Sequence, residues 1–223
     1  MKFVCLVLLC LVSLVSSISA AEKGWLVDWD AAKKKAVAED KDIFIEFTGS
    51  DWCQPCINFK KMVLDTNAFK SGVSESFILL KLDSPSDKSK QTKKEIEQYR
   101  KLSAEFKVTS VPTVVLTDAS GRPFVRMTGY GGQGPDAYVK SLLIKRDVRV
   151  VRDGLFEKAE KADGLTKARL FDKAISGIDS EFVISQYRDV VDQIIELDGS
   201  GNGGFRIKYE MAIDSANVRE SAK

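Results

Sequence analysis

The chain of 223 residues contains no histidine. This absence excludes serine–histidine and cysteine–histidine catalysis, histidine-ligated metals and the usual side-chain switch near neutral pH. Net charge is also nearly absent, since 34 lysines and arginines face 32 aspartates and glutamates. That balance disfavours a strongly basic nucleic-acid binder. No apolar run reaches about 18 residues, so no membrane-spanning helix is expected. Hydrophobic residues at 44% and charged residues at 30% are typical of a globular chain rather than a disordered one.

The first 21 residues are typical of a secretory signal peptide. Lys2 gives a positive start, an apolar stretch runs over Phe3–Val15, and small Ser19 and Ala21 stand where signal peptidase needs them. We expect cleavage after Ala21 and export to the periplasm or the extracellular space. An uncleaved anchor is the alternative, but the apolar stretch is about five residues too short for one.

Cysteine is scarce once this segment is set aside. Cys5 and Cys10 belong to the signal peptide, so the mature chain keeps only Cys53 and Cys56. A pair this close cannot close the long loops that stabilise disulfide-rich secreted domains. A closed zinc site is excluded within one chain, because it needs a second pair of ligands. A redox pair, a local disulfide clip and copper(I) held between two thiolates remain as alternatives.

The hydrophobic pattern predicts an α/β domain of three layers. Helices are expected at 30–40, 53–63 and 95–106 and from Pro135 to near Arg146, and strands at 43–47, 77–82, 111–116 and 124–127. A turn at 118–121 joins the last two strands, which predicts an antiparallel hairpin.

The composition changes after Asp147. From Val148 to Leu197 there is no strand signal, and apolar residues recur at helical spacing. We therefore divide the chain into a signal peptide at 1–21, an α/β domain at 22–147 and an α-helical extension at 148–223. The extension is expected to pack against the first domain or against a partner, with residues 215–223 frayed.

Asp198 opens a glycine-rich segment that begins like a calcium-binding EF-hand loop. Such a loop needs a bidentate glutamate at its twelfth position, which is Tyr209 here. A flexible linker before a last helix is therefore favoured.

Cys53 and Cys56 stand between a buried strand and the start of a helix. A helix N-terminus favours an anion, because unpaired N–H groups and the helix dipole point there. A thiolate is the form that attacks disulfides, so a lowered pKa at Cys53 would raise its reactive fraction. Cys56, one turn further on, would then attack the mixed disulfide, and Pro55 suits the first helical turn.

From Trp25 to Leu143 the chain resembles the thioredoxin family, and in particular exported bacterial thioredoxin-like proteins. Three motifs carry the resemblance: FTGSDWCQPC at Phe47–Cys56, KVTSVPT at Lys107–Thr113, which is similar to the cis-proline loop, and Gly129, which is similar to a glycine at the rim of the substrate groove. The resemblance implies a thioredoxin-like three-layer sandwich, here with a C-terminal α-helical extension.

The resemblance also implies roles for single residues. Cys53 would attack the substrate disulfide and Cys56 would resolve it. The Val111–Pro112 peptide would be cis, with the backbone of Val111 pairing with an extended substrate. A trans proline opening an edge strand is the alternative. Trp52 would form a wall of the substrate surface, or else a core aromatic beneath the loop.

Glu46 is the candidate proton acceptor for the second cysteine. The family often carries a buried acid in this strand, and burial raises the pKa of such a group. In the shorter thioredoxin pattern the acid stands six residues before the first cysteine, whereas here it stands seven before it. An additional residue near Gly49 either forms a bulge that keeps the register or turns Glu46 away. A carboxylate merely paired with Lys81 is the alternative role.

Two departures from the thioredoxin pattern bear on the redox potential. Gln54 replaces the usual glycine, and Ile57 stands where a lysine often follows the second cysteine. Neither adds positive charge that would stabilise a thiolate. We therefore expect a fairly reducing couple, roughly between −270 and −180 mV.

These observations predict an exported thiol–disulfide oxidoreductase, a reductase or isomerase of protein disulfides, with no cofactor and no metal. Its partners would be disulfide-containing proteins and an upstream thiol reductant, which for an exported domain would be a membrane reductase. No nucleic-acid partner is expected. One alternative is a non-catalytic interaction module whose helical extension binds a partner. Another is a homodimer in which the C-terminal helices join two redox domains.

Overall fold

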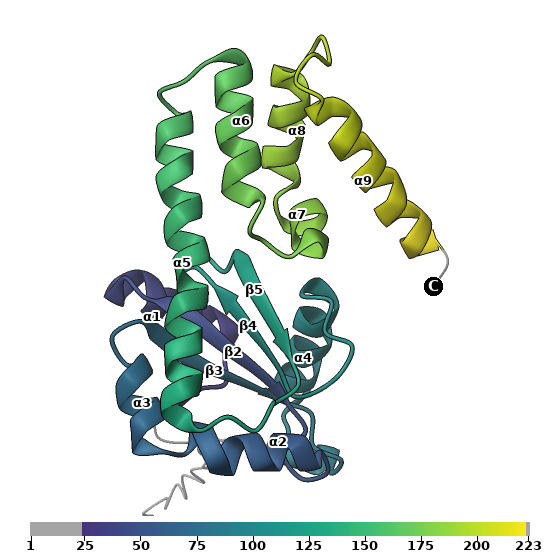
Figure 1. The fold of residues 1–223 in the computed structure, drawn as a ribbon. Coiled ribbons are helices and arrows are strands. Elements are labelled where there is room, and N and C mark those ends of the chain that lie inside the picture. The colour runs from purple at the N-terminus through teal and green to yellow at the C-terminus, as the bar shows by residue number, and fades with distance from the viewer. Residues whose placement is uncertain (1–23, 222–223) are drawn as a thin grey trace, which may run out of the picture.

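The computed structural model describes residues 24–221, so the predicted signal peptide lies outside the described residues. A sheet with helices on both faces forms the lower part of the molecule, and further helices stand above it (Figure 1). Across residues 24–221, no helix has both the length and the apolar character that a membrane crossing requires.

Five strands form one mixed sheet in the order β1-β3-β2-β4-β5. Their bounds are β1 Trp25–Leu26, β2 Asp42–Thr48, β3 Phe77–Asp83, β4 Thr113–Thr117 and β5 Pro123–Thr128. The central strand β2 runs parallel to β3 and antiparallel to β4. It is buried at every position, as its apolar run predicts. The expected β4–β5 hairpin is confirmed. The strand expected from Val111 begins only at Thr113, because Val111 and Pro112 belong to the preceding loop.

Helices cover both faces of this sheet, which confirms the three-layer α/β class. Their bounds are α1 Trp29–Glu39, α2 Gln54–Phe59, the π-helical turn η1 Lys60–Leu64, α3 Asn67–Val73, the 3-10 turn η2 Lys88–Lys90, α4 Lys93–Glu105 and α5 Pro135–Ala159. Side chains alternate along β2, so Phe47 meets Phe106 after α4 at a ring distance of 6.4 Å on one face. Phe44 meets Phe69 of α3 at 5.6 Å on the other face.

The helix expected to end near Arg146 continues to Ala159, so that expectation is wrong. No glycine or proline lies between Pro135 and Gly154 to stop it. The domain boundary expected at residue 147 therefore falls inside α5. The remaining helices are α6 Gly164–Ile175, α7 Ser180–Gln186, α8 Arg188–Leu197 and α9 Phe205–Ser221. Because α9 reaches Ser221, the fraying expected from residue 215 is not found.

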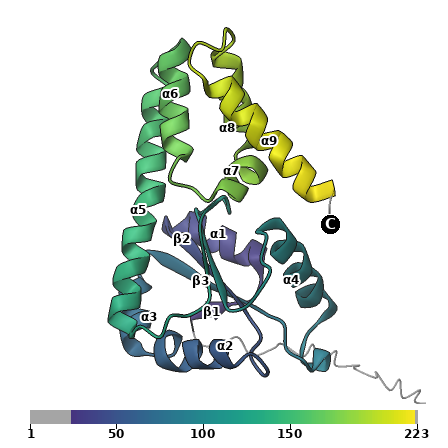
Figure 2. The same ribbon diagram turned by 45° about the vertical axis from the view of Figure 1, so that its right-hand side comes forward.

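The helices α6–α9 stand at one end of the sheet and α2 lies at the opposite end, in both views (Figures 1 and 2). A buried network joins them to the β4–β5 turn. Arg152, only 3% exposed, donates to the Tyr187 hydroxyl at 2.5 Å and to Asp118 at 2.8 Å. The Tyr187 hydroxyl donates to the carbonyl of Pro123 at 3.0 Å. The extension therefore packs against the α/β part of its own chain.

Asp198, at the start of the glycine-rich segment, accepts hydrogen bonds from three backbone N–H groups. Its buried carboxylate accepts N–H bonds from Gly203 at 2.7 Å, Phe205 at 2.8 Å and Arg206 at 3.1 Å. Phe205 and Arg206 are the first two residues of α9, and Gly203 lies just before it. The N–H groups at a helix start have no intrahelical partners, and Asp198 supplies them. The acidic residue that resembled a calcium ligand thus caps a helix.

Candidate functional site

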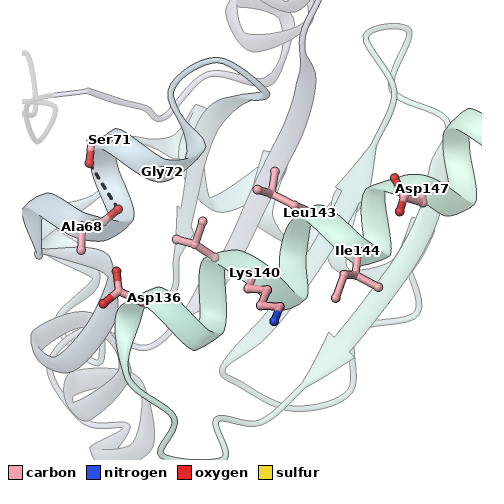
Figure 3. A pocket seen from close by; sticks show the side chains of 9 residues that line it. Ala68, Ser71, Gly72, Asp136, Lys140, Leu143, Ile144 and Asp147 are labelled. Atoms are coloured by element: carbon pink, nitrogen blue, oxygen red, sulfur yellow. Dashed lines mark hydrogen bonds between the residues drawn. The ribbon is translucent and has the colours of Figure 1, made fainter.

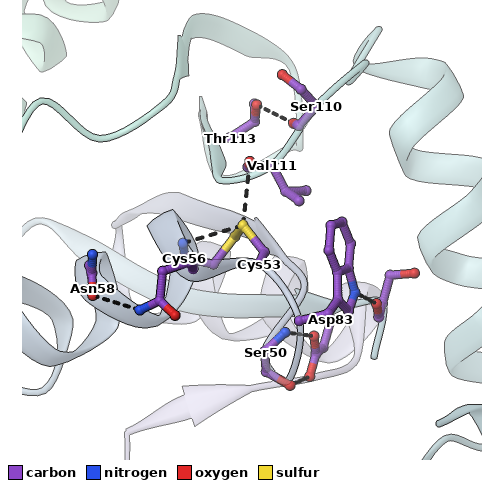
Figure 4. The surroundings of a disulfide bond; sticks show 11 residues. Ser50, Cys53, Cys56, Asn58, Asp83, Ser110, Val111 and Thr113 are labelled. Atoms are coloured by element: carbon purple, nitrogen blue, oxygen red, sulfur yellow. Dashed lines mark hydrogen bonds between the residues drawn. A yellow bond between two sulfur atoms is a disulfide. The ribbon is translucent and has the colours of Figure 1, made fainter. Parts of the chain in front are cut away.

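Cys53 and Cys56 form a disulfide at the start of α2, with their Cα atoms 5.2 Å apart (Figure 4). Cys53 is the N-cap residue, and its sulfur accepts the N–H of Cys56 at 3.3 Å. Pro55 occupies the first turn. The sequence predicted this placement at a helix N-terminus, where a thiolate is stabilised. Cys53 is 5% exposed and Cys56 1%, so Cys53 is the more accessible residue of the pair.

The loop before β4 lies directly against this disulfide. The Val111–Pro112 peptide is cis, as expected. The carbonyl oxygen of Val111 lies 3.6 Å from the sulfur of Cys53. A disulfide sulfur carries no proton, so this contact becomes a hydrogen bond only when Cys53 is a thiol. Gly129 donates its N–H to the carbonyl of Pro112 at 2.8 Å and has a φ of +83°, which favours glycine. The structure therefore brings Cys53, Val111, Pro112 and Gly129 together.

Trp52 stands beside the disulfide with 55% of its surface exposed, so it is not a core aromatic. Its indole N–H donates to the carbonyl of Ser84 at 2.8 Å. The indole lies over Gly49, where a β carbon would overlap with the ring. Two contacts thus hold this exposed ring in one orientation.

A set of residues that sequence reasoning missed holds the loop that carries Trp52. Asp83 accepts hydrogen bonds from the backbone N–H of Ser50 at 2.9 Å and from its hydroxyl (Figure 4). Asp51 accepts the N–H of Ser86 at 2.8 Å. Asp83 at the end of β3 and Ser86 just after it thus bond to the active-site loop. Thr48 and Asp83 end neighbouring parallel strands at one edge of the sheet, and this adjacency is the signal that could have identified Asp83.

Glu46 is 2% exposed and lies opposite Lys81 in the β2–β3 register. It shares a sheet face with Phe44, and Phe59 of α2 packs into the cluster on that face. Burial raises the pKa of Glu46 to about 7, although Lys81 and a hydrogen bond from Thr48 oppose the rise. The pairing of β2 with β3 is continuous, so the additional residue sits in the Gly49 turn rather than in a bulge, and Glu46 faces the core.

Metal-ligating side chains do not gather at this site. Among residues 24–221 there is no group of three or more Cys, Asp or Glu side chains arranged to hold a metal ion. The groups gathered here are two neighbouring sulfurs, a buried carboxyl and the backbone of the half-buried Val111.

Comparisons with known proteins agree with this arrangement. A family model described as a thioredoxin-like domain matches residues 29–140 and so ends inside α5. The disulfide bond reductase DsbH of Chlamydia pneumoniae is 32% identical over 125 residues, which are 56% of this chain and 74% of that protein. The thioredoxin-related protein DsbJ of the same organism is 25% identical over 109 residues, 49% of this chain and 31% of DsbJ. A solved structure of a DsbH oxidoreductase is 29% identical, with a TM-score of 0.51, and the match covers 58% of this chain and 89% of that one.

Proposed function

The chain belongs to the thioredoxin-like family and is a thiol–disulfide oxidoreductase with a Cys53–Cys56 pair, and we propose that it reduces disulfide bonds in exported proteins. The observation that carries the proposal is the pair itself, at a helix N-terminus and beside the cis-proline loop. The likeness to a protein named disulfide bond reductase supports the reducing direction. Gln54 and Ile57, the neighbours of the two cysteines, carry no positive charge that would further stabilise the Cys53 thiolate. Their neutrality favours a reducing Cys53–Cys56 couple.

The reaction takes two steps from the reduced enzyme. The Cys53 thiolate attacks one sulfur of the substrate disulfide, forming a Cys53–substrate bond and releasing the other substrate sulfur as a thiolate, which takes up a proton. Cys56 then attacks the sulfur of Cys53 and releases the second substrate thiolate. Two electrons have passed to the substrate, and the enzyme is left as the observed disulfide.

Four further residues have roles in this proposal. Glu46 takes the proton of Cys56 before the second step, for which a buried carboxyl with a pKa near neutrality is suited. The backbone of Val111 pairs with an extended substrate segment beside Cys53. Trp52 and Gly129 border that segment.

Each turnover leaves the enzyme oxidised, so it needs an upstream thiol reductant. We place the enzyme outside the cytoplasm because residues 1–21 are typical of a signal peptide. In that compartment a membrane reductase is the partner that would deliver electrons. Its substrates are disulfide-containing proteins.

A redox titration and a trapping experiment test the proposal together. Equilibration of Cys53 and Cys56 with glutathione buffers should give a potential between about −270 and −180 mV. Cys53→Ser should abolish reduction of a disulfide substrate, whereas Cys56→Ser should accumulate a mixed disulfide that dithiothreitol releases. A potential of about −120 mV would identify an oxidant instead. Full activity of Cys53→Ser would overturn the mechanism.

A further inference from the structure

The outward side of α5 carries large apolar side chains that face solvent. Leu143, Ile144, Val150 and Val151 are 38%, 60%, 52% and 56% exposed, whereas Leu142 is fully buried in the core. The pair Leu143–Ile144 recurs after seven residues as Val150–Val151, so all four lie on nearly the same side of the helix. Exposed apolar side chains gathered in this way mark an interaction surface.

A hollow lies beside this side of α5. It has a volume of about 580 Å³ and is lined by residues of α3 and α5, which pack against each other at its floor (Figure 3). Its α3 wall consists of the small residues Ala68, Ser71 and Gly72, and Ile144 stands at its α5 wall. Small residues on one wall and an apolar side chain on the other leave room for side chains of another helix.

Two charged residues flank the apolar pair Leu143–Ile144. Lys140 precedes the pair and Asp147 follows it, both exposed and both bordering the hollow. Within residues 24–221, neither of them forms an ion pair. They are two helical turns apart, about 10 Å along the axis, and so point to the same side. Asp136, one helical turn before Lys140, is also exposed and borders the hollow. The face therefore presents one positive and two negative charges, with the apolar pair Leu143–Ile144 between Lys140 and Asp147.

We propose that this face binds a second copy of the chain, through an antiparallel contact between the two α5 helices. A two-fold axis between Leu143 and Ile144 brings Lys140 opposite Asp147 of the partner subunit, and the symmetry repeats this ion pair at the other end. Leu143 then packs against Ile144 of the partner subunit. Parallel pairing would place like charges opposite each other, and a two-fold axis at Asp147 would bring two aspartates together. In this register Asp136 lies opposite Val151 of the partner subunit, so no two like charges meet across the contact. Charge complementarity thus favours a second copy of the chain in this arrangement.

This dimer differs from one formed by the helices α6–α9, because it uses the part of α5 that packs beside α3. It does not depend on the proposed reductase function. It would place two Cys53–Cys56 pairs in one particle.

Analytical ultracentrifugation of the chain without its predicted signal peptide tests the dimer. We expect a concentration-dependent monomer–dimer equilibrium. Lys140→Asp alone, or Asp147→Lys alone, places like charges opposite each other at both ends and should weaken the dimer about tenfold or more. The double variant Lys140→Asp/Asp147→Lys restores both ion pairs in reversed order, and it should return the dissociation constant to within about threefold of the wild-type value.

Matched controls separate this contact from general effects of charge. Lys34→Asp on α1 and Val218→Lys on α9 change exposed side chains elsewhere and should leave the dimer intact, whereas Ile144→Lys should abolish it. Circular dichroism would show that each variant is folded. A chain that stays monomeric at every concentration overturns the proposal. So does a dimer that both single substitutions leave unchanged, or one that the double variant does not restore.

Discussion

Glu46 and Lys81 lie opposite each other in the parallel strands β2 and β3, on the sheet face where the core includes Phe59 of α2. Because burial outweighs the attraction of Lys81, the carboxyl of Glu46 has a pKa of about 7 instead of its ordinary 4.5. Glu46 is therefore neutral in the folded protein at acid pH and loses its proton near neutrality. Two predictions follow from this single shift, one on stability and one on rate.

The free energy of unfolding should fall as the pH rises from the ordinary pKa of Glu46, 4.5, through its raised pKa of about 7. Below about pH 4 the carboxyl is protonated in both states, and between its unfolded and folded pKa values only the folded state holds the proton. A shift of this size corresponds to about 3 kcal/mol lost by pH 8. Urea unfolding at several pH values should show Glu46→Gln gaining about that amount relative to wild type at pH 8 and nothing at pH 4. Glu97→Gln, on the exposed side of α4, is the control. Parallel pH profiles for Glu46→Gln and wild type would contradict the assignment.

Glu46→Gln should also slow the second chemical step. If the carboxyl accepts the proton of Cys56, its loss leaves the mixed disulfide unresolved for longer, by about 10²-fold or more. Quenched-flow trapping of the Cys53 mixed disulfide would measure this, because the first step should keep its rate. An unchanged resolution rate would leave Glu46 as a paired carboxylate only.

Asp83 should stabilise the active-site loop and help to raise the pKa of Glu46. Asp83→Asn keeps the shape but offers one acceptor oxygen in place of two to Ser50, at an expected cost of about 1–2 kcal/mol. The charge of Asp83 also contributes to the raised pKa of Glu46, so the variant should move the Glu46 titration to lower pH. Urea unfolding and the pH dependence of thiol reactivity are the measurements. Asp87→Asn, whose carboxylate bonds to Ser89 instead, should leave the Glu46 titration in place.

Gly49 should matter because the indole of Trp52 occupies the space of its missing side chain. In Gly49→Ala the ring must move, and its hydrogen bond to Ser84 is lost. We expect kcat/KM for a protein disulfide to fall about fivefold, which corresponds to about 1 kcal/mol of lost binding. Gly131→Ala is the control, because a β carbon there meets only the end of the Gln133 side chain. Equal losses in the two variants would show that Trp52 is not a wall of the substrate surface.

Tyr187 should be a main support of the helical extension. Tyr187→Phe removes a hydroxyl that accepts from Arg152 and donates to Pro123, which leaves a buried guanidinium and a carbonyl with fewer partners. The expected cost is about 1–3 kcal/mol. Thermal unfolding should show a Tm lower by about 2–4 °C per kcal/mol. Tyr130→Phe, whose hydroxyl donates to Gln133 at the surface, should change the Tm little. A Tm equal to that of wild type would mean that the network adds nothing to stability.

Local patterns predicted most of the sheet and the helix that carries the cysteines. The apolar runs predicted β2 and β3, because a strand buried on both faces shows as a continuous hydrophobic run in the sequence. The two-residue strand β1 and the short helix α3 were missed because neither is long enough to show a period. The continuity of α5 was missed because a change in composition was taken as a break in the chain, although no residue there stops a helix.

The sequence by itself determined that two neighbouring sulfurs stand at a helix N-terminus, because strand, cysteine and proline signals all lie within one short segment. It also determined that no histidine could assist them. Only the tertiary structure decided that Glu46 faces the core, that Asp83 and Ser84 hold the loop of Trp52, and that Lys140 and Asp147 border the hollow beside α5. The physical reason is that these relationships depend on strand register, burial and long-range packing, which join residues far apart in the chain and leave no periodic signal in it.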